Sequence, residues 1–155
     1  MAFRVYISHS VSPQELGAIY GVAELAATKG MEPIVSDRRW TPDDPPARIR
    51  QLLKGLDAFV VVATASGNQL PWVNAELGEA TRAGLLPTAI VTVVDAGIEV
   101  PQAKQKVVID RDRFPETMAK TVGILEGLEL EQKHRNLLAG LVVAGIAALL
   151  LASRE

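Results

Sequence analysis

The chain of 155 residues has no cysteine and only two histidines, which excludes several kinds of site. Without cysteine there is no disulfide and no thiolate ligand for a metal. His9 and His134 are far apart in the sequence, so their spacing gives no indication of a histidine metal site. We therefore expect no bound metal.

The chain also has little net charge. The 16 basic and 18 acidic residues give a net charge of −2, without a basic cluster of the kind that neutralises phosphates. We therefore expect no nucleic-acid partner. Residues 1–9 lack the long apolar core of a secretory signal and are typical of a short strand instead.

Several motifs of common enzyme classes are missing too. The sequence has no Gly-x-Gly-x-x-Gly, no Walker loop and no Gly-x-Ser-x-Gly elbow, which argues against a Rossmann dehydrogenase, a P-loop NTPase and a serine hydrolase. A phosphoreceiver would need acidic residues after its first strand, where this chain has Ser8, His9 and Ser10. We exclude that class as well.

The chain does contain a regular alternation of strand-like and helix-like segments. The segment 57–63 is apolar almost throughout, as in a strand buried on both faces of a parallel sheet. Strands are predicted at 3–7, 31–35, 57–63, 87–94 and 106–109, and helices at 13–29, 47–55, from about 71, and at 114–128. This alternation predicts an α/β fold, with a flavodoxin-like open parallel five-stranded sheet (order 2-1-3-4-5), helices on both faces and a C-terminal apolar helix.

The C-terminal end of the chain has a different character, because residues 137–152 form an unbroken apolar run that follows Lys133, His134 and Arg135. We predict a division into three parts: an α/β domain (1–128), a charged connector (129–136) and a transmembrane helix (137–153). The basic flank predicts a single-pass C-terminal membrane anchor with the domain in the cytoplasm. A helix over the run is only roughly 24 Å long, so the alternative is an apolar helix buried against the domain or in a dimer.

In an open parallel sheet, ligands bind at the carboxyl ends of the strands, beside the point where the strand order reverses. The predicted topology brings Ser8 and His9 to this rim after the first strand, and Asp37 and Trp40 after the second. These four residues are candidates for ligand binding. Trp40 lies in a charged, proline-rich loop (36–46) and has no core of its own, so we expect it to contact a ligand or another subunit.

Trp72 and Glu76 lie four residues apart in the helix that follows the third strand, so they share one helical face. In a functional interpretation both look into the crevice at the rim, with Glu76 as a catalytic carboxylate and Trp72 as a ligand-binding side chain. The spacing by itself favours a solvated glutamate and a tryptophan that seals the edge of a core.

Three segments in this order resemble the Toll/interleukin-1 receptor (TIR) family. Residues 5–10 are similar to the first box of the family, 37–46 to its BB loop, and 59–77 to its third strand and helix. Leu70 and Val73 stand where the family often has serine and cysteine. The resemblance implies a bacterial TIR-like protein in which Glu76 has the place of the glutamate that enzymatic members use to cleave NAD.

A single carboxylate is sufficient for that reaction, because nicotinamide leaves a pyridinium riboside as a neutral molecule and needs no general acid. The carboxylate has only to stabilise an oxocarbenium-like centre. The resemblance therefore implies an NAD glycohydrolase, with NAD as a substrate and no cofactor. Its products would be nicotinamide and ADP-ribose, or a cyclic or transferred ADP-ribose, in bacterial antiviral defence or signalling.

The resemblance also implies a homo-oligomer, since enzymatic TIR domains complete their sites when BB loops of neighbouring copies pack together. Small residues that recur every four positions in the tail would let helices approach closely; they are Gly140, Ala144, Ala148 and Ala152. Two alternatives remain open. One is a non-catalytic TIR interaction or adaptor module that assembles through its BB loop at a membrane, and the other is a nucleoside deoxyribosyltransferase-like enzyme.

Overall fold

Five parallel strands form a single sheet in the computed structural model, which describes residues 2–152, with side chains as far as Leu141. The strands are β1 (Arg4–Ser10), β2 (Glu32–Ile34), β3 (Ala58–Ala63), β4 (Ile90–Val94) and β5 (Gln105–Val108). Their order is β2-β1-β3-β4-β5, and all four neighbouring pairs are parallel. The predicted flavodoxin-like sheet order is confirmed.

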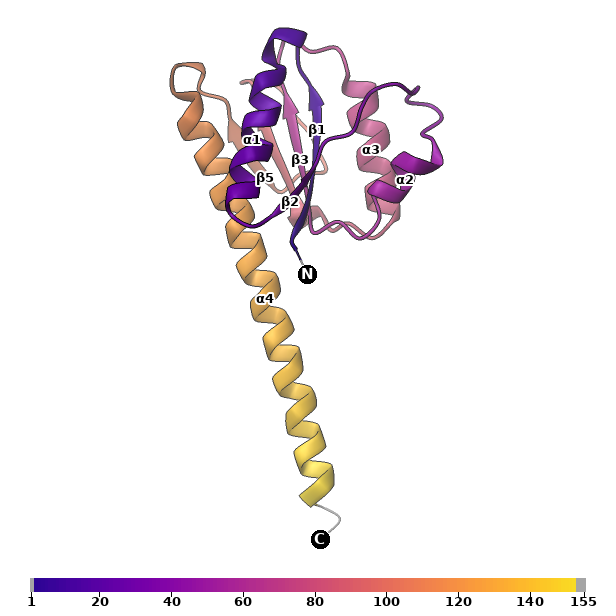
Figure 1. Cartoon of the computed structure of the whole chain (residues 1–155), viewed down its shortest axis with the longest axis vertical. Helices are drawn as coiled ribbons and strands as arrows, with labels where there is room; N and C mark the ends of the chain where they lie inside the picture. Colours follow the sequence, from indigo (N-terminus) through magenta and orange to yellow (C-terminus); the bar gives the residue numbers. More distant parts are fainter. Residues whose placement is uncertain (1, 153–155) are drawn as a thin grey trace.

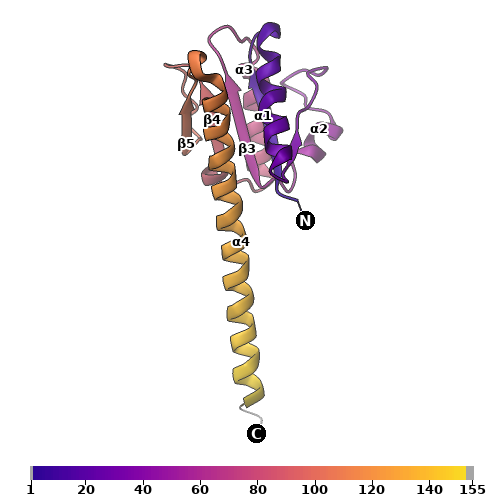
Figure 2. The same ribbon diagram turned by 60° about the vertical axis from the view of Figure 1, so that its left-hand side comes forward.

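Within the same residues, four α-helices cover the two faces of the sheet (Figure 1). They are α1 (Leu16–Thr28), α2 (Ala47–Leu52), α3 (Leu70–Arg82) and α4 (Phe114–Ala152). Helices α1 and α4 lie side by side on one face, as Figure 2 shows from a second direction, and α2 and α3 lie on the other. The prediction of helices on both faces is therefore confirmed.

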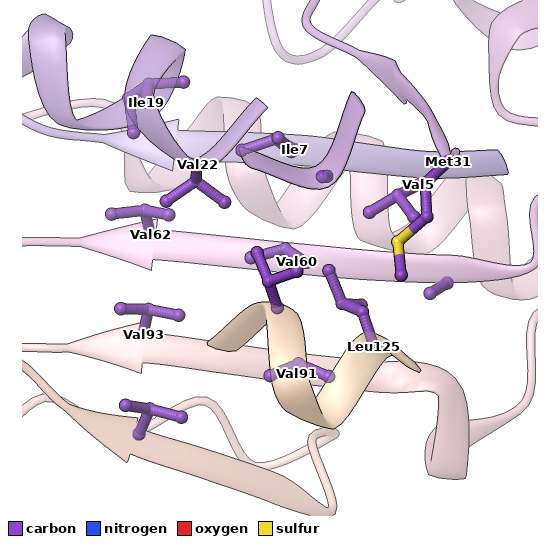
Figure 3. Packing of buried hydrophobic residues seen from close by; sticks show 14 of the residues in the cluster. Val5, Ile7, Ile19, Val22, Met31, Val60, Val62, Val91, Val93 and Leu125 are labelled. Atoms are coloured by element: carbon purple, nitrogen blue, oxygen red, sulfur yellow. The ribbon is translucent and has the colours of Figure 1, made fainter. Parts of the chain in front are cut away.

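Alternate residues of each strand point to opposite faces of the sheet, which divides the core into two clusters. On the face of α1 and α4, Val5 and Ile7 of β1 belong to one cluster with Leu125 of α4 (Figure 3). On the face of α3, the Tyr6 ring stacks on Phe59 with the ring centroids 5.4 Å apart. Even-numbered residues of β1 thus point towards α3, and this decides which of its side chains reach the site.

The predicted helix start at Pro13 is correct, but the first turn, Pro13–Glu15, is a 3-10 turn rather than α-helix. The backbone N–H of Ser12 donates to the Glu15 carboxylate at 2.9 Å. The hydroxyls of Thr64 and Ser66 donate to the same carboxylate at 2.8 and 2.6 Å. Burial works to raise the pKa of Glu15, but these hydrogen bonds outweigh it and hold the pKa well below its usual range. Glu15 thereby ties the start of α1 to the loop after β3.

Helix α4 is much longer than predicted. Its 39 residues form one continuous helix, so the predicted helix end near Leu128 is wrong, and the segment 129–136, predicted as a charged connector, lies within the helix. Those eight positions contain no glycine or proline and are rich in glutamate, leucine, glutamine, lysine and arginine, which favour helix. In Figure 1 the second half of α4 extends beyond the sheet.

The prediction of a transmembrane helix at 137–153 is wrong. Among the residues that the structure describes, no helix is both long enough and apolar enough to cross a membrane. Helix α4 is long, but its apolar run of 16 residues follows a charged segment and spans only roughly 24 Å, against about 30 Å for a hydrocarbon core. The single-pass anchor and the membrane localisation predicted from it are wrong for the same reason. Ser153 itself lies outside the described residues.

Candidate active site

Glu76 lies in α3, and its side chain is completely buried against the carboxyl end of the sheet. Ser8 Oγ donates to Glu76 Oε1 at 2.8 Å, and Arg38 Nη2 forms an ion pair with the same oxygen at 2.9 Å. Ser36 Oγ donates to Oε2 at 2.8 Å, and the Tyr6 hydroxyl donates to that oxygen as well. The carboxylate is thus held from β1 and from the loop after β2 at the same time.

The positions of these partners follow from the local structure. Tyr6 and Ser8 are even-numbered residues of β1, so both point towards α3. Ser36 and Arg38 come directly after β2, which pairs with β1, so they arrive at the same edge of the sheet. The predicted meeting of Ser8 and Glu76 at the rim is therefore observed.

Burial dominates the electrostatics around Glu76. It raises the pKa of the Tyr6 hydroxyl, and the neighbouring Glu76 carboxylate raises it further. Burial also lowers the pKa of the Arg38 guanidinium, an effect that the attraction of Glu76 opposes. Tyr6 therefore stays a neutral hydrogen-bond donor near pH 7.

A pocket of about 270 Å³ lies beside this cluster, between α1 and the loops that follow β1, β2 and β3. Its polar lining consists of His9, Ser36, Asp37, Arg38, Asn68 and Gln69. Ser36 and Arg38 line the pocket and also contact Glu76, so they lie between the pocket and the carboxylate. The expectation that Glu76 looks directly into the crevice is therefore wrong, because its carboxylate is covered.

His9 is an odd-numbered residue of β1 and lines the pocket close to α1. It is 6% exposed, and within the described part of the chain its Nδ1 has no hydrogen-bond partner. Burial, helped by the positive charge of Arg38, lowers the pKa of His9 to about 4, so the imidazole is neutral at pH 7. A neutral imidazole can donate or accept at Nδ1, which makes this atom available to a ligand.

Asp37 also lines the pocket, but its carboxylate is engaged by α2. Both terminal nitrogens of Arg48 donate to it, Nη1 to Oδ2 at 2.8 Å and Nη2 to Oδ1 at 3.1 Å. The backbone N–H of Arg39 adds a hydrogen bond at 3.0 Å. These bonds hold the pKa of Asp37 below its usual range, and the hydrogen bonding from Arg48 has the largest effect. Asp37 therefore fastens the loop after β2 to α2.

The two candidate tryptophans pack on the apolar cluster of the α3 face. Trp40 is only 8% exposed, so the premise that it has no core of its own is wrong. Its indole Nε1 donates to the carbonyl of Asp37 at 2.9 Å, and Trp72 Nε1 donates to the carbonyl of Trp40 at 2.7 Å. These bonds hold the loop 36–46 against α3.

The loop after β3 approaches β1 so closely that position 67 admits only glycine. A Cβ on Gly67 would lie 1.9 Å from the carbonyl oxygen of Ser10. The N–H of Thr64 donates to this oxygen at 3.0 Å, and the N–H of Gln69 donates to Ser10 Oγ at 2.9 Å. The pocket residues Asn68 and Gln69 therefore depend on Gly67 for their position.

Gly67→Ala should push this loop away from β1 and lower the free energy of unfolding by about 1–3 kcal/mol, the usual range for an overpacked site. Urea denaturation measures the difference from wild type. Gly127→Ala is the matched control, because a Cβ there meets nothing within 4 Å and alanine favours helix. Equal tolerance of alanine at both positions would contradict the close approach.

Tyr6, Ser36 and Arg38 were not identified as site residues from the sequence. For Tyr6 a signal was present, since strand alternation places it on the same face as Ser8. For Ser36 and Arg38 the only signal was their place directly after the second strand. Among the described residues, no group of three or more histidine, aspartate and glutamate side chains is arranged to hold a metal ion.

Comparisons with known proteins add no assignment to this site. No protein-family model matches the sequence, and a comparison with curated proteins finds no match. The function of the chain therefore has to be inferred from the chemistry of Glu76, its partners and the adjacent pocket.

Proposed function

We propose that this chain is a TIR-like enzyme that cleaves NAD, with Glu76 as its catalytic carboxylate. One observation supports the proposal above others. A single glutamate is held at the carboxyl edge of the sheet by Ser8, Ser36, Arg38 and the Tyr6 hydroxyl, next to a pocket at the β1–β3 switch point. This edge is where open α/β sheets bind nucleotides.

The reaction breaks the bond between C1′ of the ribose and the pyridinium nitrogen. The bonding electrons go to nicotinamide, which leaves as a neutral molecule, and positive charge develops on the ribose. The Glu76 carboxylate stabilises this charge from one side until water adds to C1′ and releases a proton. One NAD and one water thus give nicotinamide, ADP-ribose and a proton; an internal or external nucleophile in place of water gives a cyclic or transferred product.

The present arrangement corresponds to a closed state of such an enzyme. Glu76 has no exposed surface, and Arg38 and Ser36 separate it from the pocket. Substrate can reach the carboxylate only after these two side chains move, together with part of the loop 36–46 that carries them. We propose that contact between copies of the chain promotes this opening.

Helix α4 offers a surface for such contacts. Among the side chains of α4 that the structure describes, four leucines are at least 48% exposed: Leu130, Leu137, Leu138 and Leu141. Large apolar side chains that cluster on one projecting helix favour association with another protein surface. A second copy of α4 would cover them.

The proposal is tested by incubating NAD with the purified full-length chain over a wide range of protein concentrations. Nicotinamide and an ADP-ribose product should appear in equal amounts, and the rate per molecule should rise as the protein associates. Size-exclusion chromatography with light scattering reports the association in the same samples. No nicotinamide at any concentration, from folded and associated protein, would contradict the proposal.

A non-catalytic interaction module is the second candidate, and one observation favours it. The Glu76 carboxylate is completely buried and both of its oxygens have partners, as expected of a purely structural ion pair. Such a module would associate through the loop 36–46 without consuming NAD. Association that is insensitive to Glu76→Gln, with no release of nicotinamide, would support this candidate over the enzyme.

A further inference from the structure

Another pocket, of about 340 Å³, lies against a different face of α1 from the pocket beside Glu76. It is bounded by α1, the start of α4, the carboxyl end of β3 and the segment after β5. Its volume is within the range of about 300–1,000 Å³ that is usual for small-molecule sites. Its apolar side chains are Val11, Ala18, Val62, Ile109, Phe114 and Met118.

The pocket lies where small residues of α1 face large residues of α4. Gly17 and Gly21 are four positions apart on α1, and Phe114 and Met118 are four positions apart on α4, so each pair shares one helical face. Met118 Sδ lies 2.9 Å from the place that a Cβ on Gly21 would take. A Cβ on Gly17 would meet nothing from the rest of the described chain within 4 Å. Helix α4 therefore fills the space beside Gly21 and leaves the space beside Gly17 open.

The backbone does not require glycine at position 17. Gly17 is not among the described glycines with a positive φ, and glycine is unfavourable in a helix. What a glycine in a helix does allow is close approach of another group to the backbone. The half-buried Phe114 contributes an aromatic ring to the same pocket. The open space between Gly17 and Phe114 therefore suits a flat apolar group.

The two charged residues of the lining, Glu15 and Arg111, are already paired. Arg111 Nη1 contacts the Glu15 carboxylate at 3.1 Å, and its Nη2 contacts Asp95 at 2.7 Å. Hydrogen bonds to Asp95 and Glu15 raise the pKa of Arg111, so it stays protonated at neutral pH. A charged ligand would have to break these pairs, whereas an uncharged ligand leaves them intact.

We propose that this pocket binds an uncharged molecule built on one or two aromatic rings, with a ring in the space between Gly17 and Phe114. A cavity of about 150 Å³ is enough for benzene, so about 340 Å³ accommodates a second ring or a polar substituent. Phe114 would contact the ring in an offset or edge-to-face arrangement. The bound molecule would also contact α1, the helix that forms one wall of the pocket beside Glu76.

The test uses the methyl groups of methionine. The chain has only three methionines, so carbon-13 labelling of their methyl groups gives a simple spectrum. Met118 lines the pocket, whereas Met31 is buried in the core, at the opposite end of the cluster from Ile19 (Figure 3). Indole and benzamide, titrated into the full-length chain, should shift the Met118 signal with dissociation constants of about 1 mM or tighter and leave the Met31 signal in place. Benzoate has the same ring as benzamide but carries a charge, so it should bind at least about tenfold more weakly.

Gly17→Leu places a side chain in the open space, so it should weaken the binding of indole and benzamide by at least about tenfold. Leucine favours helix over glycine, so this variant should fold. Gly123→Leu is the matched control, because Gly123 is an exposed glycine of α4 outside the pocket, where a Cβ also meets nothing within 4 Å among the described residues. It should bind as wild type does.

Three results would overturn the proposed site. They are an unmoved Met118 signal with both neutral compounds, equal binding by folded Gly17→Leu, and binding of benzoate as tight as that of benzamide. The measured quantity is a chemical shift and does not depend on NAD cleavage, so failure of this site and failure of the proposed enzyme are distinguishable.

Discussion

Arg38→Met should lower the free energy of unfolding by about 3–5 kcal/mol, the range for removing one partner of a buried ion pair. Glu76 has no exposed surface and Arg38 is 9% exposed, so the substitution leaves a carboxylate in the core without a counter-charge. The hydroxyls of Tyr6, Ser8 and Ser36 would still donate to it, but they carry no full charge. Urea denaturation followed by far-ultraviolet circular dichroism measures the loss.

The exposed pair of Arg48 and Asp37 supplies the control. Their side chains are 50% and 44% exposed, so Arg48→Met should cost no more than about 1 kcal/mol. Addition of Glu76→Gln to Arg38→Met removes the unpaired charge and keeps an acceptor for the hydroxyls, so it should recover about half of the lost stability or more. Equal losses in the two single variants, or no recovery in the double variant, would contradict the buried pair.

Much of the sheet could be predicted because its strands carry strong and separate signals. The segments 57–63 and 87–94 are short apolar runs, which are typical of central strands covered on both faces. Alternation of strands with helices then restricts the topology to a few parallel sheets. The strand ends were less certain: Pro87–Ala89 forms a 3-10 turn before β4, because proline cannot donate to a strand ladder.

The approach of Ser8 to Glu76 could be predicted from topology, but the closure of the site could not. Burial of Trp40 depends on how the loop 36–46 folds back on α3, and that loop has no periodic pattern to indicate it. Pairing of Arg38 with Glu76 joins positions 38 residues apart in the sequence and requires the three-dimensional path of the same loop. Patterns among neighbouring residues in the sequence predict neither the burial of Trp40 nor the pairing of Arg38 with Glu76.

The continuation of α4 through 129–136 was predictable in hindsight from helix propensity. Its charged residues indicated a connector, yet charged residues with long side chains are also common on exposed helix faces. The length of the apolar run, at roughly 24 Å as a helix, already fell short of a bilayer core. For predicting whether the helix spans a membrane, the length of the apolar run was a better indicator than the absence of a polar face.

Glu76→Gln should reduce nicotinamide release from NAD by about 100-fold or more, the usual range for removing a group that stabilises charge in a transition state. Glutamine has the size of glutamate and its carbonyl oxygen still accepts a hydrogen bond, but it has no charge to oppose the oxocarbenium-like ribose. Arg38 loses its partner in this variant, so near-ultraviolet circular dichroism has to verify the fold.

The initial rate of nicotinamide release at equal, high concentrations of three proteins tests the role of Glu76 most directly. The proteins are wild type, Glu76→Gln and Glu79→Gln. Glu79 lies one turn further along α3 and pairs with exposed Arg82 at 2.7 Å, so Glu79→Gln removes the same charge from the same helix at a distance from the pocket. We expect release by wild type and Glu79→Gln at similar rates and almost none by Glu76→Gln. Equal release by folded wild type and folded Glu76→Gln would contradict the catalytic role of Glu76.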